Sequence, residues 1–92
     1  MSKERVNIIV HGSVQGVFYR ARTKEKAVEL ELTGWVRNRI DRTVEIVAEG
    51  KKEDLDRLVE WSRHGPKHAH VTNIDVSWQP FADEFGDFTV KY

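Results

Sequence analysis

The chain has 92 residues, enough for one domain over residues 1–92 and too few for a second hydrophobic core. Its 15 Lys and Arg balance 15 Asp and Glu, which argues against a nucleic-acid binder, because such proteins neutralise phosphates with surplus positive charge. The lack of cysteine excludes a disulfide scaffold, a thiolate zinc site and a cysteine nucleophile. No apolar run approaches the ~18 residues of a membrane span, so we expect a cytoplasmic protein with no membrane partner.

The first third of the chain predicts a strand, a glycine-containing loop and a helix. Residues Val6–His11 are apolar and largely β-branched, which indicates a strand buried on both faces. Glycines at positions 12 and 16 interrupt this pattern. From about Phe18 to Leu30 the periodicity is helical, and a buried stripe is expected at Thr23, Ala27 and Leu30.

Two alternating segments then predict a β-hairpin, Trp35–Ile40 followed by Thr43–Glu49. The inner faces of the two segments are expected to carry Val36, Asn38 and Ile40 in the first, and Val44, Ile46 and Ala48 in the second. Arg42 is unfavourable in a two-residue turn, where glycine is preferred, so the loop between the strands is expected to be longer than two residues.

A second helix and two further strands complete the chain. Residues Lys52–His64 are amphipathic and end at Gly65-Pro66, where glycine favours a helix end and proline cannot continue the helix. The buried stripe of this helix is expected at Leu55, Leu58, Val59 and Ser62. Strands are predicted at Val71–Trp78 and Phe88–Tyr92.

This order of elements predicts an α+β fold of the ferredoxin-like βαββαβ type. Two helices would cover one face of an antiparallel sheet, and a short extra C-terminal strand would extend it. Such a fold hosts enzymes, RNA binders and ligand sensors alike, so it does not decide the function.

The loop over residues 12–20, Gly-Ser-Val-Gln-Gly-Val-Phe-Tyr-Arg, carries the signals of an anion site. Its glycines let a ligand approach the main chain, and the helix after it has no side chain suited to capping its first N–H groups. Arg20 and Arg22 lie in the first turn, where the helix dipole disfavours cations. No Asp or Glu occurs from Arg5 to Lys24. A bound anion would satisfy the N–H groups and offset both arginines.

The same loop closely resembles the acylphosphatase signature G-x-V-Q-G-V-x-F-R, with Tyr19 where that family usually has Phe. Gly34-Trp35-Val36-Arg37-Asn38 is similar to the family's second signature, G-W-V-x-N. The likeness continues through Val44–Gly50 and the Gly65-Pro66 stop, in the same order. Glu31 and Arg42 depart from the family pattern, which commonly has glycine at both positions.

The resemblance implies hydrolysis of acyl phosphates to a carboxylate and inorganic phosphate, without metal or other cofactor. It assigns Arg20 to binding the phosphoryl group and Asn38 to orienting the attacking water. The loop would bind the phosphoryl oxygens through the backbone amides of Gln15, Gly16, Val17, Phe18 and Tyr19. It further implies that inorganic phosphate and similar anions compete with the substrate, and that the protein is a monomer.

Two other functions are compatible with the fold. One is a non-catalytic anion-binding or regulatory module that keeps the loop but lacks turnover. The other is an RNA binder of the RRM type, which the balanced charge and the absence of an aromatic RNP1 pattern argue against. The pair His68 and His70 lacks a third ligand in register, so a metal site is not expected. His11 is the last residue of the first predicted strand, beside the loop; a role in tuning the anion site is conceivable there, but a structural or solvent-facing role is expected.

Overall fold

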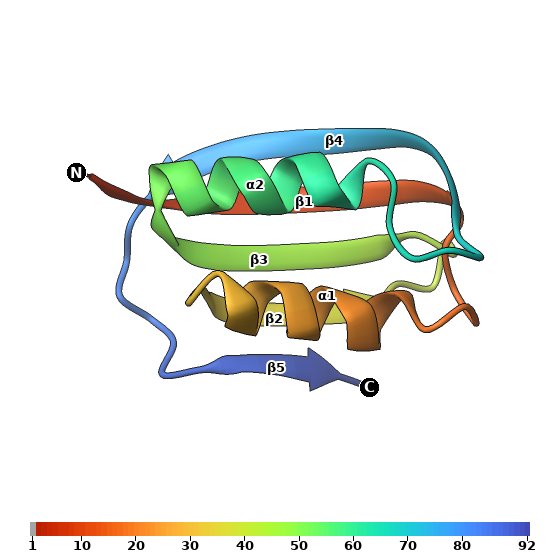
Figure 1. The fold of residues 1–92 in the computed structure, drawn as a ribbon, viewed down its shortest axis with the longest axis horizontal. Helices are drawn as coiled ribbons and strands as arrows, with labels where there is room; N and C mark the ends of the chain where they lie inside the picture. Colours follow the sequence, from red (N-terminus) through yellow and green to blue (C-terminus); the bar gives the residue numbers. More distant parts are fainter. Residues whose placement is uncertain (1) are drawn as a thin grey trace.

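The computed structural model describes residues 2–92 and shows a five-stranded sheet with both helices on one face (Figure 1). The elements, in chain order, are β1 (Lys3–Ser13), α1 (Tyr19–Glu29), β2 (Thr33–Asn38), β3 (Val44–Lys51), α2 (Lys52–Ser62), β4 (His70–Pro80) and β5 (Phe88–Lys91). Neither helix is long and apolar enough to cross a membrane.

The strands lie in the order β4-β1-β3-β2-β5. Pairing is antiparallel between β1 and both of its neighbours and between β2 and β3, whereas β5 pairs with β2 in parallel. This arrangement confirms the predicted ferredoxin-like sandwich and its extra strand. It also brings the ends of β1, β2 and β5 to the same end of the sheet, beside the start of α1 (Figure 1).

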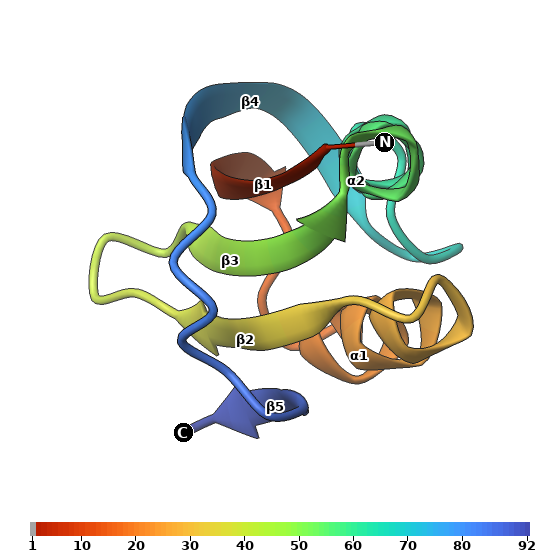
Figure 2. The same ribbon diagram turned by 90° about the vertical axis from the view of Figure 1, so that its left-hand side faces the viewer.

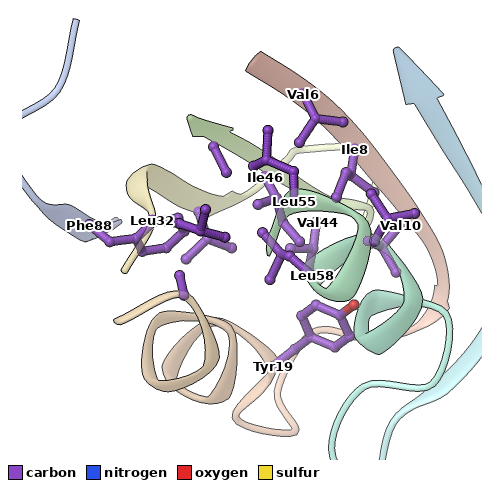
Figure 3. Packing of buried hydrophobic residues seen from close by; sticks show 14 of the residues in the cluster. Val6, Ile8, Val10, Tyr19, Leu32, Val44, Ile46, Leu55, Leu58 and Phe88 are labelled. Carbon is purple, nitrogen blue, oxygen red and sulfur yellow. The ribbon is translucent and has the colours of Figure 1, made fainter. Parts of the chain in front are cut away.

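The core lies between the sheet and the two helices (Figure 3). Alternate residues of β1, Val6, Ile8 and Val10, are fully buried there, as are Val44 and Ile46 of β3. The predicted stripe of α2 is confirmed, since all four of its residues are buried. In α1, Thr23 and Ala27 are buried, and Leu30, the residue after the end of the helix, packs at the edge of the core. Burial of such aliphatic side chains, at roughly 1.5–3 kcal/mol each, holds the helices to the sheet.

Two sequence expectations about strand faces are wrong. The strand β1 is buried on one face only, because both helices lie on that face and Asn7 and Ile9 on the other remain partly accessible. Ile40 does not continue β2: the strand ends at Asn38, and the side chain of Ile40 is fully exposed in the loop. The loop covers residues 39–43, which confirms that it is longer than two residues.

The segment between β4 and β5 crosses the end of the sheet opposite the start of α1 (Figure 2). The buried carboxylate of Glu49 holds this segment by accepting hydrogen bonds from the backbone N–H groups of Ala82 and Glu84, at 2.8 and 3.1 Å. Arg5 lies 3.5 Å from the same carboxylate and also pairs with the Glu84 side chain. These contacts anchor the segment that leads into β5.

Candidate active site

β1 contains a bulge two residues before its end, just ahead of the loop that leads to α1. The register of β1 against β4 shifts between His11 and Gly12, and Gly12 has a φ of 125°. A Cβ at this position would collide with the backbone carbonyl of His70, so only glycine fits here. Pairing with β4 continues through Ser13, and the loop to α1 begins there, so the bulge lies beside the loop, as bulges often do near functional sites.

The start of α1 is uncapped, as the sequence predicts. Phe18 occupies the N-cap position in the left-handed conformation, with a φ of 64°, and offers no side-chain hydrogen bond to the helix. No acidic residue lies in the first turn. A non-glycine residue held in this conformation costs roughly 1–3 kcal/mol, a kind of strain that collects at functional sites. The side chain of Phe18 is 76% exposed, so burial of its ring does not offset that cost.

Arg20 projects from the first turn of α1 to the end of β5. Its Nη1 donates a 3.0 Å hydrogen bond to the backbone carbonyl of Lys91, and its guanidinium lies 4.7 Å from the centre of the Tyr92 ring. Within residues 2–92 no carboxylate forms an ion pair with Arg20. Arg22, in the same turn, pairs with Glu25 at 2.8 Å. The two arginines therefore differ: the charge of Arg22 is compensated and that of Arg20 is not.

Asn38 is the last residue of β2 and is half-buried. Its side-chain amide forms no hydrogen bond with another residue in the described part of the chain. The residue before it, Arg37, pairs with Lys91 of β5, so Asn38 lies at the end of the β2–β5 ladder, close to the group that accepts from Arg20.

Arg20 and Asn38 line one pocket of about 290 Å³. From the predicted set, Gly16, Phe18 and Tyr19 also line it, whereas Gln15 and Val17 do not. The remaining walls come from residues that the sequence did not single out, Val14, Ala21, Val90 and Tyr92. The pocket thus joins a guanidinium that has no carboxylate partner within residues 2–92, an amide with no hydrogen bond to those residues, and the uncapped helix start, a combination suited to an anion.

Tyr19 has a second role in addition to its place at the pocket. Its ring is buried in the core against Trp61, with ring centres 5.5 Å apart. Burial raises the pKa of the Tyr19 hydroxyl above its usual range, so this group is a hydrogen-bond donor and not a base.

The side chain of Gln15 points away from the pocket to the loop between β2 and β3. Its Nε2 donates two hydrogen bonds of 2.9 Å, to the carbonyls of Arg39 and Thr43. Sequence reasoning considered only the backbone of Gln15, because nothing in the pattern shows that distant backbone carbonyls would meet its amide. The same holds for Lys91, whose contribution is a carbonyl and not a side chain.

The histidines lie apart from this pocket. His11 pairs with Asp75 at 2.7 Å, and its side chain is 39% exposed. Residues 2–92 contain no group of three or more His, Cys, Asp or Glu side chains placed to hold a metal ion.

Nearly the full length of the chain is similar to known proteins. The profile of the acylphosphatase family matches residues 6–90. A protein named acylphosphatase from Pelotomaculum thermopropionicum is 45% identical over 92 residues, with 100% of both chains covered. Another from Methylococcus capsulatus is 52% identical over 87 residues, which cover 95% of each chain. The crystal structure of acylphosphatase from Bacillus subtilis has a TM-score of 0.93 at 37% identity, covering 97% of this chain and 99% of the other.

Proposed function

Because the chain belongs to the acylphosphatase family and is an enzyme that hydrolyses acyl phosphates, we propose that its pocket supplies a phosphoryl clamp and a water-orienting amide. The clamp is the loop over residues 12–20 with Arg20, and the amide is that of Asn38. The observation that supports this most is the shared pocket of Arg20 and Asn38, in which neither side chain pairs with a carboxylate of residues 2–92.

Arg20 and the loop bind the transferred phosphoryl group. The guanidinium presents several N–H donors to the phosphoryl oxygens, and a charge-assisted hydrogen bond of this kind is about twice as strong as a neutral one. The backbone N–H groups of residues 15–19 add further donors where the dipole of α1 favours an anion. The stacking of Arg20 on Tyr92 and its bond to Lys91 fix the guanidinium before substrate arrives.

Asn38 orients the nucleophile. Its amide holds a water in line with the bond from phosphorus to the acyl oxygen, and the water oxygen attacks phosphorus as that bond breaks. The electron pair leaves on the carboxylate, and a phosphoryl oxygen takes the proton of the water. The products are a carboxylate and inorganic phosphate.

The leaving group explains why so few side chains suffice. A carboxylic acid has a pKa of about 4, so the carboxylate departs without protonation and the site needs no general acid. Positioning and electrostatic stabilisation then carry the reaction, and the proposed mechanism uses no metal or cofactor. A monomer as the active unit stays a prediction, which the molecular mass of the protein in solution tests. The cytoplasmic location stays a prediction, which cell fractionation tests.

The test is hydrolysis of benzoyl phosphate by the purified protein, with inorganic phosphate as a competitive inhibitor. Arg20→Ala should lower kcat/KM by at least about 100-fold and abolish inhibition by phosphate. Asn38→Ala should lower kcat by a similar factor and leave the phosphate inhibition constant within about twofold of the parent value. Arg22→Ala is the matched control, since its charge is already paired with Glu25, and it should retain activity.

Two results would change the proposal. Equal loss of phosphate inhibition in Arg20→Ala and Asn38→Ala would contradict the separation of clamp and water-orienting amide. Phosphate binding without any turnover would instead support a non-catalytic anion-binding module.

A further inference from the structure

The side chain of Gln15 connects the loop over residues 12–20, hereafter the phosphate loop, to the loop that follows Asn38. One amide nitrogen donates to two carbonyls, those of Arg39 and Thr43, at 2.9 Å each. We infer that Gln15 is a positioning residue that holds Asn38 at the correct distance from the bound phosphoryl group. This inference rests on the proposed function, because it acts through the water-orienting role of Asn38.

One carbonyl lies next to the residue that has to be positioned, and the other lies next to that residue's partner on β3. Asn38 pairs with Val44 at the end of the β2–β3 ladder. Arg39 directly follows Asn38, and Thr43 directly precedes Val44. The amide of Gln15 therefore binds both strands immediately beyond the Asn38–Val44 pair and fixes that end of the hairpin to the phosphate loop.

The other polar contacts of the loop over residues 39–43 lie within the loop itself. Ile40 is fully exposed, and Arg42 has a φ of 73°, which is unfavourable for a residue with a side chain. Its internal bonds are that of Arg39 N–H to the Thr43 carbonyl, the turn bond of Arg42 N–H to the Arg39 carbonyl, and those that Thr43 makes to Asp41. These bonds shape the loop but do not connect it to the phosphate loop, whereas the Gln15 bonds do.

Glutamine suits this contact because its side chain can donate two hydrogen bonds from one nitrogen. The primary amide has two N–H donors, and both are used by the two carbonyl acceptors. Leucine has a similar volume but no donor, and a glutamate carboxylate would face two carbonyl oxygens without a proton to share. Without these donors the end of β2 is free to move relative to the bound phosphoryl group. A displacement of about 1 Å of a positioning group lowers a rate by up to about 100-fold.

The test is Gln15→Leu, made alone and together with Asn38→Ala, with Gln79→Leu on the exposed face of β4 as the matched control. Gln15→Leu should lower kcat for benzoyl phosphate by about tenfold or more, and leave the phosphate inhibition constant within about twofold. In the Asn38→Ala background the same change should have almost no further effect on kcat, because the residue that Gln15 positions is absent. Gln79→Leu should change neither constant.

A second readout does not depend on activity. The N–H of Arg39 bonds to the Thr43 carbonyl, and its hydrogen exchange should become at least about tenfold faster in Gln15→Leu, because the end of the hairpin opens more often. Exchange in the centre of β1 should stay unchanged, which also shows that the variant is folded. Unchanged exchange at Arg39 would overturn the inference even if the variant lost activity.

The kinetic outcomes separate the two proposals. If Asn38→Ala retains kcat, the proposed role of Asn38 fails, and the inference about Gln15 fails with it. If Asn38→Ala loses kcat and Gln15→Leu does not, only the inference about Gln15 is wrong. An equal effect of Gln15→Leu in both backgrounds also overturns it, because Gln15 would then act independently of Asn38.

Discussion

The hydroxyl of Tyr19 donates a 2.8 Å hydrogen bond to the backbone carbonyl of Ser62, and so ties the first turn of α1 to the last turn of α2. The carbonyls at a helix end have no partner within the helix, so this bond satisfies a group that is buried and otherwise unpaired. The family pattern usually has Phe at this position. The tyrosine therefore adds a link between the two helices directly beside the pocket.

Tyr19→Phe should lower the free energy of unfolding by about 1 kcal/mol, because it removes one buried hydrogen bond and leaves the Ser62 carbonyl unpaired. The activity should be nearly unchanged, since the ring still packs on Trp61. Urea unfolding measures the first effect and benzoyl phosphate hydrolysis the second. Tyr92→Phe is the control, since Tyr92 is fully exposed and its hydroxyl makes no bond within residues 2–92. A stability equal to that of the parent in Tyr19→Phe would show that the bond contributes nothing.

Glu31→Gly should raise the free energy of unfolding by about 1 kcal/mol. Glu31 has a φ of 59°, and the N–H of Leu32 bonds to the Ala27 carbonyl at 2.9 Å, the pattern of a helix end that favours glycine. A residue with a side chain pays roughly 1–2 kcal/mol for this conformation. Thermal unfolding monitored by circular dichroism checks the shift. Glu29→Gly, within α1, should have the opposite effect, and stabilisation by both changes would contradict this explanation.

The ionised carboxylate of Glu45 should stabilise the fold at neutral pH, and this contribution should be lost in acid. Burial raises the pKa of this carboxyl, but the hydrogen bonds from Asn7 and Arg37, with the charges of Arg37 and Arg39, lower it more, so its pKa lies below the ordinary 4.5. A group with a depressed folded pKa stabilises the fold above its unfolded pKa, and that contribution is lost as the pH falls through the folded value. The unfolding free energies of the parent and Glu45→Gln should therefore differ at pH 7, and the difference should shrink as the pH falls below the ordinary pKa of 4.5 toward the lower folded value. A difference that is constant between pH 3 and 7 would refute this role.

Glu49→Gln should loosen the segment between β4 and β5. The variant loses the charge that faces Arg5, and its amide N–H₂ group meets a backbone N–H that needs an acceptor. We expect a loss of about 2 kcal/mol in unfolding free energy, with faster hydrogen exchange at Ala82 and Glu84. Glu29→Gln, an exposed residue in a 3.6 Å pair with Lys26, should have little effect. Unchanged exchange at Ala82 would show that other contacts hold the segment.

The periodic elements could be predicted from the sequence because the spacing of their apolar side chains indicates which face is buried. The stripe of α2 follows directly from the spacing of Leu55, Leu58 and Val59. Strand ends were less accurate: β1 runs from Lys3 to Ser13, since backbone pairing continues through charged residues at its start and through Gly12 and Ser13 at its end, none of which carries a hydrophobic signal. Only one face of β1 is buried because both helices pack on that face, and a run of β-branched residues does not show where the helices will pack.

The proposed site could be predicted from the sequence only where it depends on a side chain. Arg20 and Asn38 were identified from the two signatures, and both line the same pocket. The contacts of Gln15 and Lys91 were not, because each involves a backbone carbonyl at a position remote in the chain. Any residue has such a carbonyl, so the sequence contains no sign of it. The hydrogen bonds that the Glu49 carboxylate accepts from the N–H groups of Ala82 and Glu84 could not be predicted, because they too involve backbone groups.

The order of the strands in the sheet also affects the rate at which the protein folds. Only β2 and β3 form a hairpin; β1 pairs with β3 and β4, and β2 pairs with β5, across much longer stretches of chain. The bond from Arg20 to Lys91 joins residues 71 positions apart. Closing such long loops lowers the entropy of the chain before the stabilising contacts between their ends have formed. Domains dominated by pairings between distant residues therefore fold slowly, in milliseconds to seconds. The arrangement that places Arg20 beside β5 therefore makes this small domain a slow folder for its size.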